Sequence, residues 1–298
     1  MSTTIPGNRG LAASLALGLL VGASLAPAPS AAQDLPHVSY ETPARSSLLP
    51  VERFLRAGRS LERIRQAALL TRLPAGLRYR AGNCGRADAW YAPDMRTVTL
   101  CYEYVEELWG ELHPRGTADA IELRSLQGYV DLTLLHETAH AFFDLLHVPV
   151  LGREEDAADQ LATLILLKLP PEEARTSIGQ VVATMKAITG TGELTIEDVA
   201  DDHSLTSQRL HNIVCLAYGR HHRSYRPLAL EIHMPPWRRR ACRSEYRQVA
   251  NAFRKLIGPH VIGERNAISA FRRIYGRKAV ALPIEELGLK TSTNMGRR

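Results

Sequence analysis

Residues 131–146 read DLTLLHETAHAFFDLL, and this stretch decides how the rest of the chain is interpreted. Most of its residues are apolar and they fall on most sides of a helix, so the pattern predicts a helix that is largely buried. His136 and His140 stand four residues apart, so on a helix both side chains project from the same face. Buried polar side chains need partners, and the two histidines therefore indicate a shared ligand.

The spacing of His136, Glu137 and His140 is that of the H-E-x-x-H motif. Two imidazole nitrogens at about 2 Å from one centre form half of a tetrahedral zinc site. Glu137 projects about 100° further round the helix, which suits contact with a water better than ligation. In such sites the metal lowers the pKa of a water toward about 7, and the carboxylate moves its proton. We predict one Zn²⁺ bound by His136 and His140, with Glu137 as the catalytic base.

The segment GREEDAADQLA, residues 152–162, supplies acids for a third ligand. The helix that carries His140 runs on for about two turns, breaks and returns, so an early acid of the returning helix faces the histidines. Glu155 is the preferred ligand, and Asp159 is predicted to accept the second ring N–H of a histidine ligand and fix its orientation. Capping of the helix N-terminus is the alternative role for these acids. Three other acids stay open as the third ligand: Asp159, Glu154 and Asp156.

Three longer stretches resemble a bacterial family of secreted metallopeptidases with no assigned substrate: NCGRADAWYAPDMRTVTLCYE, HETAHAFFDLLHVPVLGREEDAADQLA and DDHSLTSQRLHNIVCLAYG. HETAH followed by Glu-x-x-x-Asp also resembles the gluzincin branch of zinc metallopeptidases. The resemblance spans about residues 48–255 and implies a zincin-like fold, zinc and peptide-bond hydrolysis. It implies His136, His140 and Glu155 as ligands and Glu137 as the base. One departure is that only fourteen residues separate His140 from Glu155, a short spacing for that branch.

Periodicity predicts a helix-rich α+β fold, zincin-like, with a small antiparallel sheet or hairpin packed on the H-E-x-x-H helix. The hairpin is expected where alternating residues flank the turn APDMR, before Cys101. By analogy with zincin-like folds, its edge strand is expected to pair with an extended peptide or protein substrate. Helices are expected at 48–73 (one or two), 102–112, 117 or 123 to 147, 153–169, 172–188, 205–217 and 243–256.

The N-terminus has the layout of a secretory signal peptide. Arg9 precedes an apolar run at 11–26, and the small residues Ser30 and Ala32 predict cleavage after Ala32. The protein is therefore expected to be periplasmic or secreted, without a transmembrane span after cleavage, because no other stretch is long and apolar enough. An uncleaved, membrane-tethered form is the alternative. The expected organisation is 1–32 signal peptide, 33–46 disordered leader, 47–260 metallopeptidase domain and 261–298 C-terminal extension of uncertain structure.

Export changes how the four cysteines are interpreted, because disulfides persist in oxidising compartments. Three pairings are possible. Proximity in sequence favours Cys84 with Cys101 and Cys215 with Cys242. No C-x-x-C spacing points to a thiolate zinc site.

His203, in the sequence ADDHSL, is a further catalytic candidate. A histidine oriented by Asp201 or Asp202 can donate to a developing oxyanion, while a place beside a helix N-cap at Ser204 is the structural alternative. Asp144 has two possible roles: it supports the site, or it is an acid that faces solvent.

The chain has a net charge of +6, and the excess is local. Between Arg220 and Arg247 there are eight arginines against Glu231 and Glu245. In an exported protein, an anionic envelope surface is a better partner for this segment than nucleic acid, which is not expected. A solvated basic face is the simplest interpretation. The rival to a peptidase is a non-catalytic exported protein, either a metal-stabilised or a basic binding module.

Overall fold

The computed structural model describes residues 35–112, 120–189, 194–263 and 269. The predicted signal peptide and nearly all of the predicted C-terminal extension lie outside these residues. The helix-rich α+β class is confirmed. Among the described residues, none of the helices has both the length and the apolar composition needed to cross a membrane.

The sheet has four short strands in the order β1-β2-β4-β3. The predicted hairpin is present: β3 (Ala89–Ala92) pairs antiparallel with β4 (Thr97–Cys101). β4 is central and buried along its whole length, as its apolar and β-branched residues require. The prediction of an antiparallel sheet holds for this pair only, because β1 (His37–Tyr40) and β2 (Arg78–Gly82) pair parallel, as do β2 and β4. Two helices connect β1 to β2, and a helical crossover produces parallel pairing.

The prediction of a disordered leader at 33–46 is wrong for β1. Its four residues pair in register with β2, from His37 opposite Arg78 to Tyr40 opposite Ala81. Every residue of β1 is exposed or half-buried. Val38 and Tyr40 alternate with the exposed His37 and Ser39 and pack against the core, so a short alternating pattern and the backbone ladder together hold this strand.

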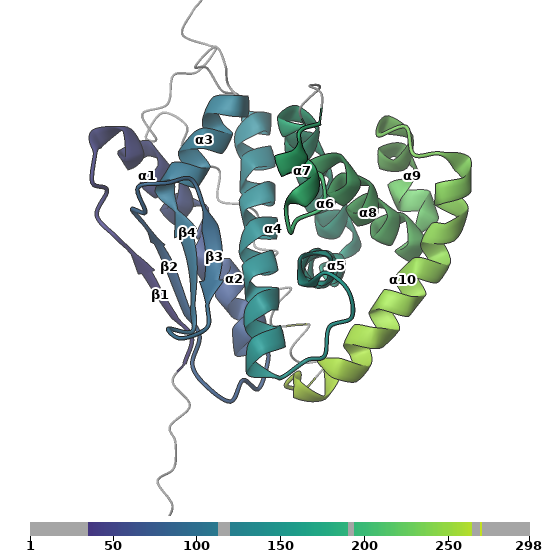
Figure 1. Ribbon diagram of the computed structural model, residues 1–298, viewed down its shortest axis with the longest axis horizontal. Coiled ribbons are helices and arrows are strands. Elements are labelled where there is room, and N and C mark those ends of the chain that lie inside the picture. Colours follow the sequence, from purple (N-terminus) through teal and green to yellow (C-terminus); the bar gives the residue numbers. More distant parts are fainter. Residues whose placement is uncertain (1–34, 113–119, 190–193, 264–268, 270–298) are drawn as a thin grey trace, which may run out of the picture. The chain divides into compact units, whose positions relative to one another are not determined.

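α4 (Ala120–Leu145) is the central element and carries the H-E-x-x-H motif. It contacts β3 and β4 on one side and α2 (Ser60–Leu69), α5 (Glu154–Leu167) and α6 (Pro171–Ile188) on others. Figure 1 shows α4 running between the sheet on one side and α5 to α10 on the other. Contact on nearly all sides explains why this helix is apolar around most of its circumference.

The chain turns back directly after α4. His147 adopts a left-handed φ of 50°, followed by Pro149 and by Gly152 with a φ of 93°. α5 then begins with three acids in its first turn, which the positive end of the helix dipole favours. This reversal places the first two turns of α5 beside the histidines of α4.

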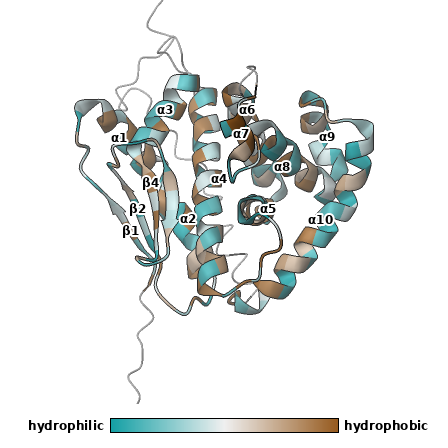
Figure 2. Ribbon diagram, in the orientation of Figure 1, coloured by the Kyte–Doolittle hydropathy of each residue, from teal (hydrophilic) through white to brown (hydrophobic). Residues whose placement is uncertain are grey.

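The other helices complete two groups around α4. α1 (Leu49–Ala57) and α3 (Tyr102–Leu112) lie with α2 near the sheet. α8 (Thr206–Arg220) contacts α5, α6 and α10 (Pro236–Leu256), and α9 (His222–Glu231) contacts α6 and α8. The short α7 (Ile196–Ala200) precedes α8. Figure 2 shows α10 as mainly hydrophilic with interspersed hydrophobic positions, the pattern of a helix at the surface.

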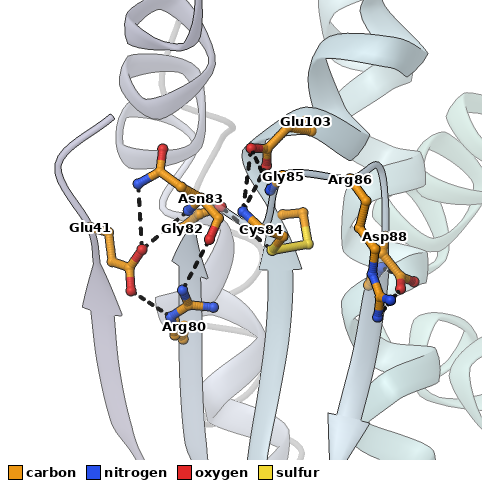
Figure 3. Close-up of a disulfide and its surroundings, with 11 residues drawn as sticks. Glu41, Arg80, Gly82, Asn83, Cys84, Gly85, Arg86, Asp88 and Glu103 are labelled. Carbon is orange, nitrogen blue, oxygen red and sulfur yellow. Dashed lines mark hydrogen bonds and ion pairs between the residues drawn. A yellow bond between two sulfur atoms is a disulfide. The ribbon is translucent and has the colours of Figure 1, made fainter. Parts of the chain in front are cut away.

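Both predicted disulfides are present: Cys84–Cys101 and Cys215–Cys242. The first ties the end of β2 to the end of β4, and Figure 3 shows its surroundings. The Glu103 carboxylate accepts hydrogen bonds from the backbone N–H groups of Cys84 and Gly85. The disulfide and these hydrogen bonds therefore hold the segment after β2 against the end of β4 and the start of α3. The second disulfide joins α8 to α10.

Candidate metal centre

Three side chains from two helices meet at one point. The Nε2 atoms of His136 and His140 are 3.1 Å apart. Glu155 Oε2 lies 2.8 Å from Nε2 of His136 and 3.4 Å from Nε2 of His140. The predicted donor set therefore converges, because one turn of α4 supplies both rings and the first turn of α5 supplies the carboxylate.

This donor set fits a metal ion. Ligand atoms bound about 2 Å from a tetrahedral ion are themselves about 3.3 Å apart, close to the three observed separations. Two imidazole nitrogens 3.1 Å apart repel each other unless a proton or a cation lies between them. Two neutral nitrogens and one carboxylate oxygen are ligands that suit a divalent metal of the zinc type. His136, His140 and Glu155 are thus the residues that would hold the ion.

The four acids that competed for the third-ligand position occupy four different places. Asp159 Oδ1 lies 2.9 Å from Nδ1 of His136. Glu154 Oε1 lies 2.8 Å from Nδ1 of His140, and Asp156 accepts from the Ser204 hydroxyl at 2.8 Å. Only Glu155 faces both Nε2 atoms. An acid at each Nδ1 directs the lone pair of the opposite nitrogen toward the centre.

Arg209, on α8, was not predicted. Its Nε and Nη2 donate to the two oxygens of Asp159 at 2.7 and 2.9 Å. Asp159 is 6% exposed, so this bidentate pair is screened from water. Burial raises the pKa of Asp159, but the hydrogen bonds and charge of Arg209 outweigh it and hold that pKa well below its usual range. Nothing in the local sequence SQRLH marks Arg209, because its partner lies fifty residues away.

The metal-free centre attracts protons. Burial lowers the pKa of His140, but hydrogen bonds to Glu155 and Glu154 raise it to about 9. The pKa of His136 is also raised, because hydrogen bonds to Asp159 and Glu155 exceed the opposing effect of burial. Burial likewise raises the pKa of Glu155, while its histidine neighbours lower it further, and the net pKa falls. The carboxylates that stabilise protons on these histidines would also stabilise a bound cation.

Glu137 borders a pocket of about 490 Å³, and so does His136, one of the three candidate ligands. The side chain of Glu137 is 7% exposed, and among the described residues none donates a hydrogen bond to its carboxylate. Burial raises its pKa, the neighbouring histidines lower it, and the net pKa is raised. A carboxylate with these properties is placed to exchange a proton with a group in the pocket.

His203 lies at the same pocket, from the segment between α7 and α8. Its Nε2 is 2.8 Å from Glu155 Oε2, and its ring stacks on His136 with centroids 5.7 Å apart. Its Nδ1 is within 3.2 Å of Asp201 and 3.1 Å of Asp202, the two acids that the sequence offered as orienting groups. The hydrogen bond to Glu155 raises the pKa of His203, burial opposes it, and the pKa is about 9.

Asp144, one turn beyond His140, lies away from the three ligand atoms. It accepts a hydrogen bond from the Tyr91 hydroxyl of β3 at 2.7 Å. This contact joins the edge strand to α4. Ala89, at the start of β3, borders the pocket. The edge of the sheet and the candidate metal centre are therefore held together.

Two histidines one helical turn apart, a glutamate between them and an acid from the next helix define the class of H-E-x-x-H hydrolases. Comparison with family models places the chain more narrowly. Residues 40–257, most of the chain, match a family described as "Putative metallopeptidase", and the protein belongs to that family. No curated protein and no solved structure matches the chain.

Proposed function

We propose that this protein is a zinc-dependent endopeptidase in which Glu137 is the general base. The observation that carries the proposal is the convergence of His136, His140 and Glu155 beside a pocket that Glu137 borders. Zinc, when bound, supplies Lewis acidity that polarises a peptide carbonyl and acidifies a water. Glu137 accepts the proton of that water and delivers it to the leaving amine nitrogen. The water oxygen thereby joins the carbonyl carbon as the C–N bond breaks.

His203 is proposed to stabilise the negative charge that develops on the carbonyl oxygen. It borders the pocket, and Asp201 and Asp202 lie within 3.2 Å of its Nδ1, which leaves its Nε2 as the hydrogen-bond donor. Asp159 is proposed to orient His136 through its Nδ1 proton. Extended substrate is proposed to lie along β3, whose outer edge has no partner strand in the described sheet.

The test compares Glu137→Gln with the wild-type protein in metal content and hydrolysis of a broad peptide library. Both proteins should hold about one zinc ion per chain, and only the wild type should cleave, with a loss of at least about 100-fold in the variant. Glu122→Gln, the same substitution near the other end of α4, should retain activity. Full hydrolysis by Glu137→Gln contradicts the base assignment. Zinc binding with no cleavage by either protein favours the rival, a non-catalytic metal-stabilised module.

We also propose that the protein acts after export, with cleavage after Ala32. The two disulfides support this, since such bonds persist outside reducing compartments. The mass of the mature protein should correspond to a chain that begins at Gln33. A mass that includes the apolar segment supports the membrane-tethered form.

The basic segment is proposed to contact an anionic envelope surface. Its two acids are already paired, Glu231 with Lys186 and Glu245 with Arg238. Arg240, Arg243 and Arg247 are exposed and share one face of α10, at spacings of three and four residues. Sedimentation with anionic phospholipid vesicles should fall with added salt and with Arg240→Gln/Arg243→Gln. Equal sedimentation with neutral vesicles contradicts this surface.

A further inference from the structure

A second cavity lies away from the candidate metal centre, in a groove between α2, α4, α5 and α10. Its volume is about 720 Å³, and it shares no bordering residue with the pocket beside Glu137. Its walls are mainly aliphatic and aromatic, with Leu70, Phe142, Leu161, Ile165, Phe253 and Ile257 among them. Protein interiors are normally packed with few voids larger than a water molecule. An apolar space of this size matches the range of small-molecule sites, about 300–1,000 Å³.

The charged side chains at this groove all have the same sign. Lys168, Arg247 and Arg254 border it and are exposed, and no Asp or Glu is among the described residues that do so. Arg247 and Arg254 lie seven residues apart on α10, so they project from the same face. The groove thus combines an apolar interior with a cationic rim, which complements a molecule with an alkyl chain and an anionic head.

Three uncharged polar side chains of the groove, Thr71, Tyr246 and Asn251, already have hydrogen-bond partners within the protein. Thr71 Oγ1 donates to the Ala67 carbonyl at 2.9 Å. Arg220 donates to the Tyr246 hydroxyl at 3.1 Å, and Arg254 donates to Asn251 at 2.6 Å. A peptide in this groove would leave backbone N–H and C=O groups unpaired, at a cost in free energy. An alkyl chain needs no such partners.

We propose that this groove binds a long-chain carboxylate of the fatty-acid type. The alkyl chain lies against the apolar walls from α4, α5 and α10, and the carboxylate pairs with Arg247 and Arg254. Phe142 is two residues from His140, and Leu161 is two residues from Asp159, so the ligand contacts the same helices that carry the candidate metal centre. The proposal does not depend on peptidase activity.

Laurate, a twelve-carbon carboxylate, is the probe, used below the concentration at which it forms micelles. Titration calorimetry on the full-length mature protein should show one laurate per chain. Butyrate tests the need for the chain, and dodecyltrimethylammonium, with the same chain and opposite charge, tests the need for the anion. Each should bind at least tenfold more weakly than laurate.

The variant Arg247→Gln/Arg254→Gln should weaken laurate binding at least tenfold. Arg78→Gln/Arg124→Gln, which removes two exposed arginines that do not border the groove, is the matched control and should stay within twofold of the wild type. Circular dichroism checks that both variants fold. Unchanged laurate affinity in the first variant, equal binding of the cationic amphiphile, or absence of laurate binding overturns the proposal. A dimer that laurate dissociates also overturns it, because the groove's occupant is then a second copy of the chain.

Discussion

Glu155 and Asp159 lie one turn apart on α5, yet they meet opposite nitrogens of the His136 ring. All the competing acids lie within the first two turns of α5, so residue type and spacing do not distinguish their roles. The path of the chain between α4 and α5 does. A second helix then supplies Arg209, which anchors Asp159 and leaves Glu155 to face the centre. Each carboxylate thus has a role set by the group that lies next to it.

Replacing Arg209 tests this arrangement at the scale of one residue. Arg209→Met leaves Asp159 buried without its cation, so zinc affinity should fall about 10–100-fold and unfolding free energy by about 3–5 kcal/mol. Competition with a chelator and urea unfolding measure the two effects. Arg175→Met, which breaks an exposed pair with Glu172, should change stability by less than about 1 kcal/mol. Equal effects of the two substitutions contradict a special role for Arg209.

At the scale of helices and strands, most elements followed their periodicity, and α9 and the start of α10 did not. α4, α5 and α6 begin and end near the predicted residues. α10 begins at Pro236, earlier than predicted, because proline is tolerated in the first turn of a helix. α9 was not predicted, since it contains Pro227 and few apolar residues. These helices are held by packing on α8 and not by their own sequence preference.

Gly219 determines how closely α8 and α10 approach. A Cβ at this position would lie 2.1 Å from the Cys242 carbonyl oxygen. Gly219→Ala should therefore destabilise the protein by about 2–3 kcal/mol in urea unfolding, as overpacking does. At Gly110, on α3, a Cβ meets no heavy atom within 4 Å, and Gly110→Ala should be neutral or stabilising by up to about 1 kcal/mol. Opposite signs for the two alanines are the expected result.

At the scale of the whole molecule, metal binding and folding are linked through protons. In the metal-free protein the folded pKa of His140 and His203 is about 9, above their unfolded value near 6.5. Protonation therefore stabilises the metal-free fold, fully below about pH 6.5, and this contribution is lost as pH rises through 9. Zinc competes with those protons, so its affinity rises over the same interval.

The difference in unfolding temperature between zinc-loaded and metal-free protein should consequently grow from pH 6.5 to 9. Thermal unfolding followed by circular dichroism, with and without a chelator, measures it. His136→Ala, which lacks a ligand, should show no zinc-dependent difference at any pH. A difference that shrinks as pH rises would show that protons do not compete with zinc at this centre.

Sequence alone was sufficient for the motif helix, the hairpin and the two disulfides, because each depends on local spacing or on pairs close in the chain. It narrowed the third ligand to four acids of one segment, with Glu155 preferred. The family and the helix-rich class followed from the same stretches. Only the tertiary structure decided which acid meets which nitrogen, since that depends on how α5 returns against α4. It also revealed β1, Arg209 and the cationic groove. These features join segments far apart in the chain, and local periodicity in a single sequence does not say which segments meet.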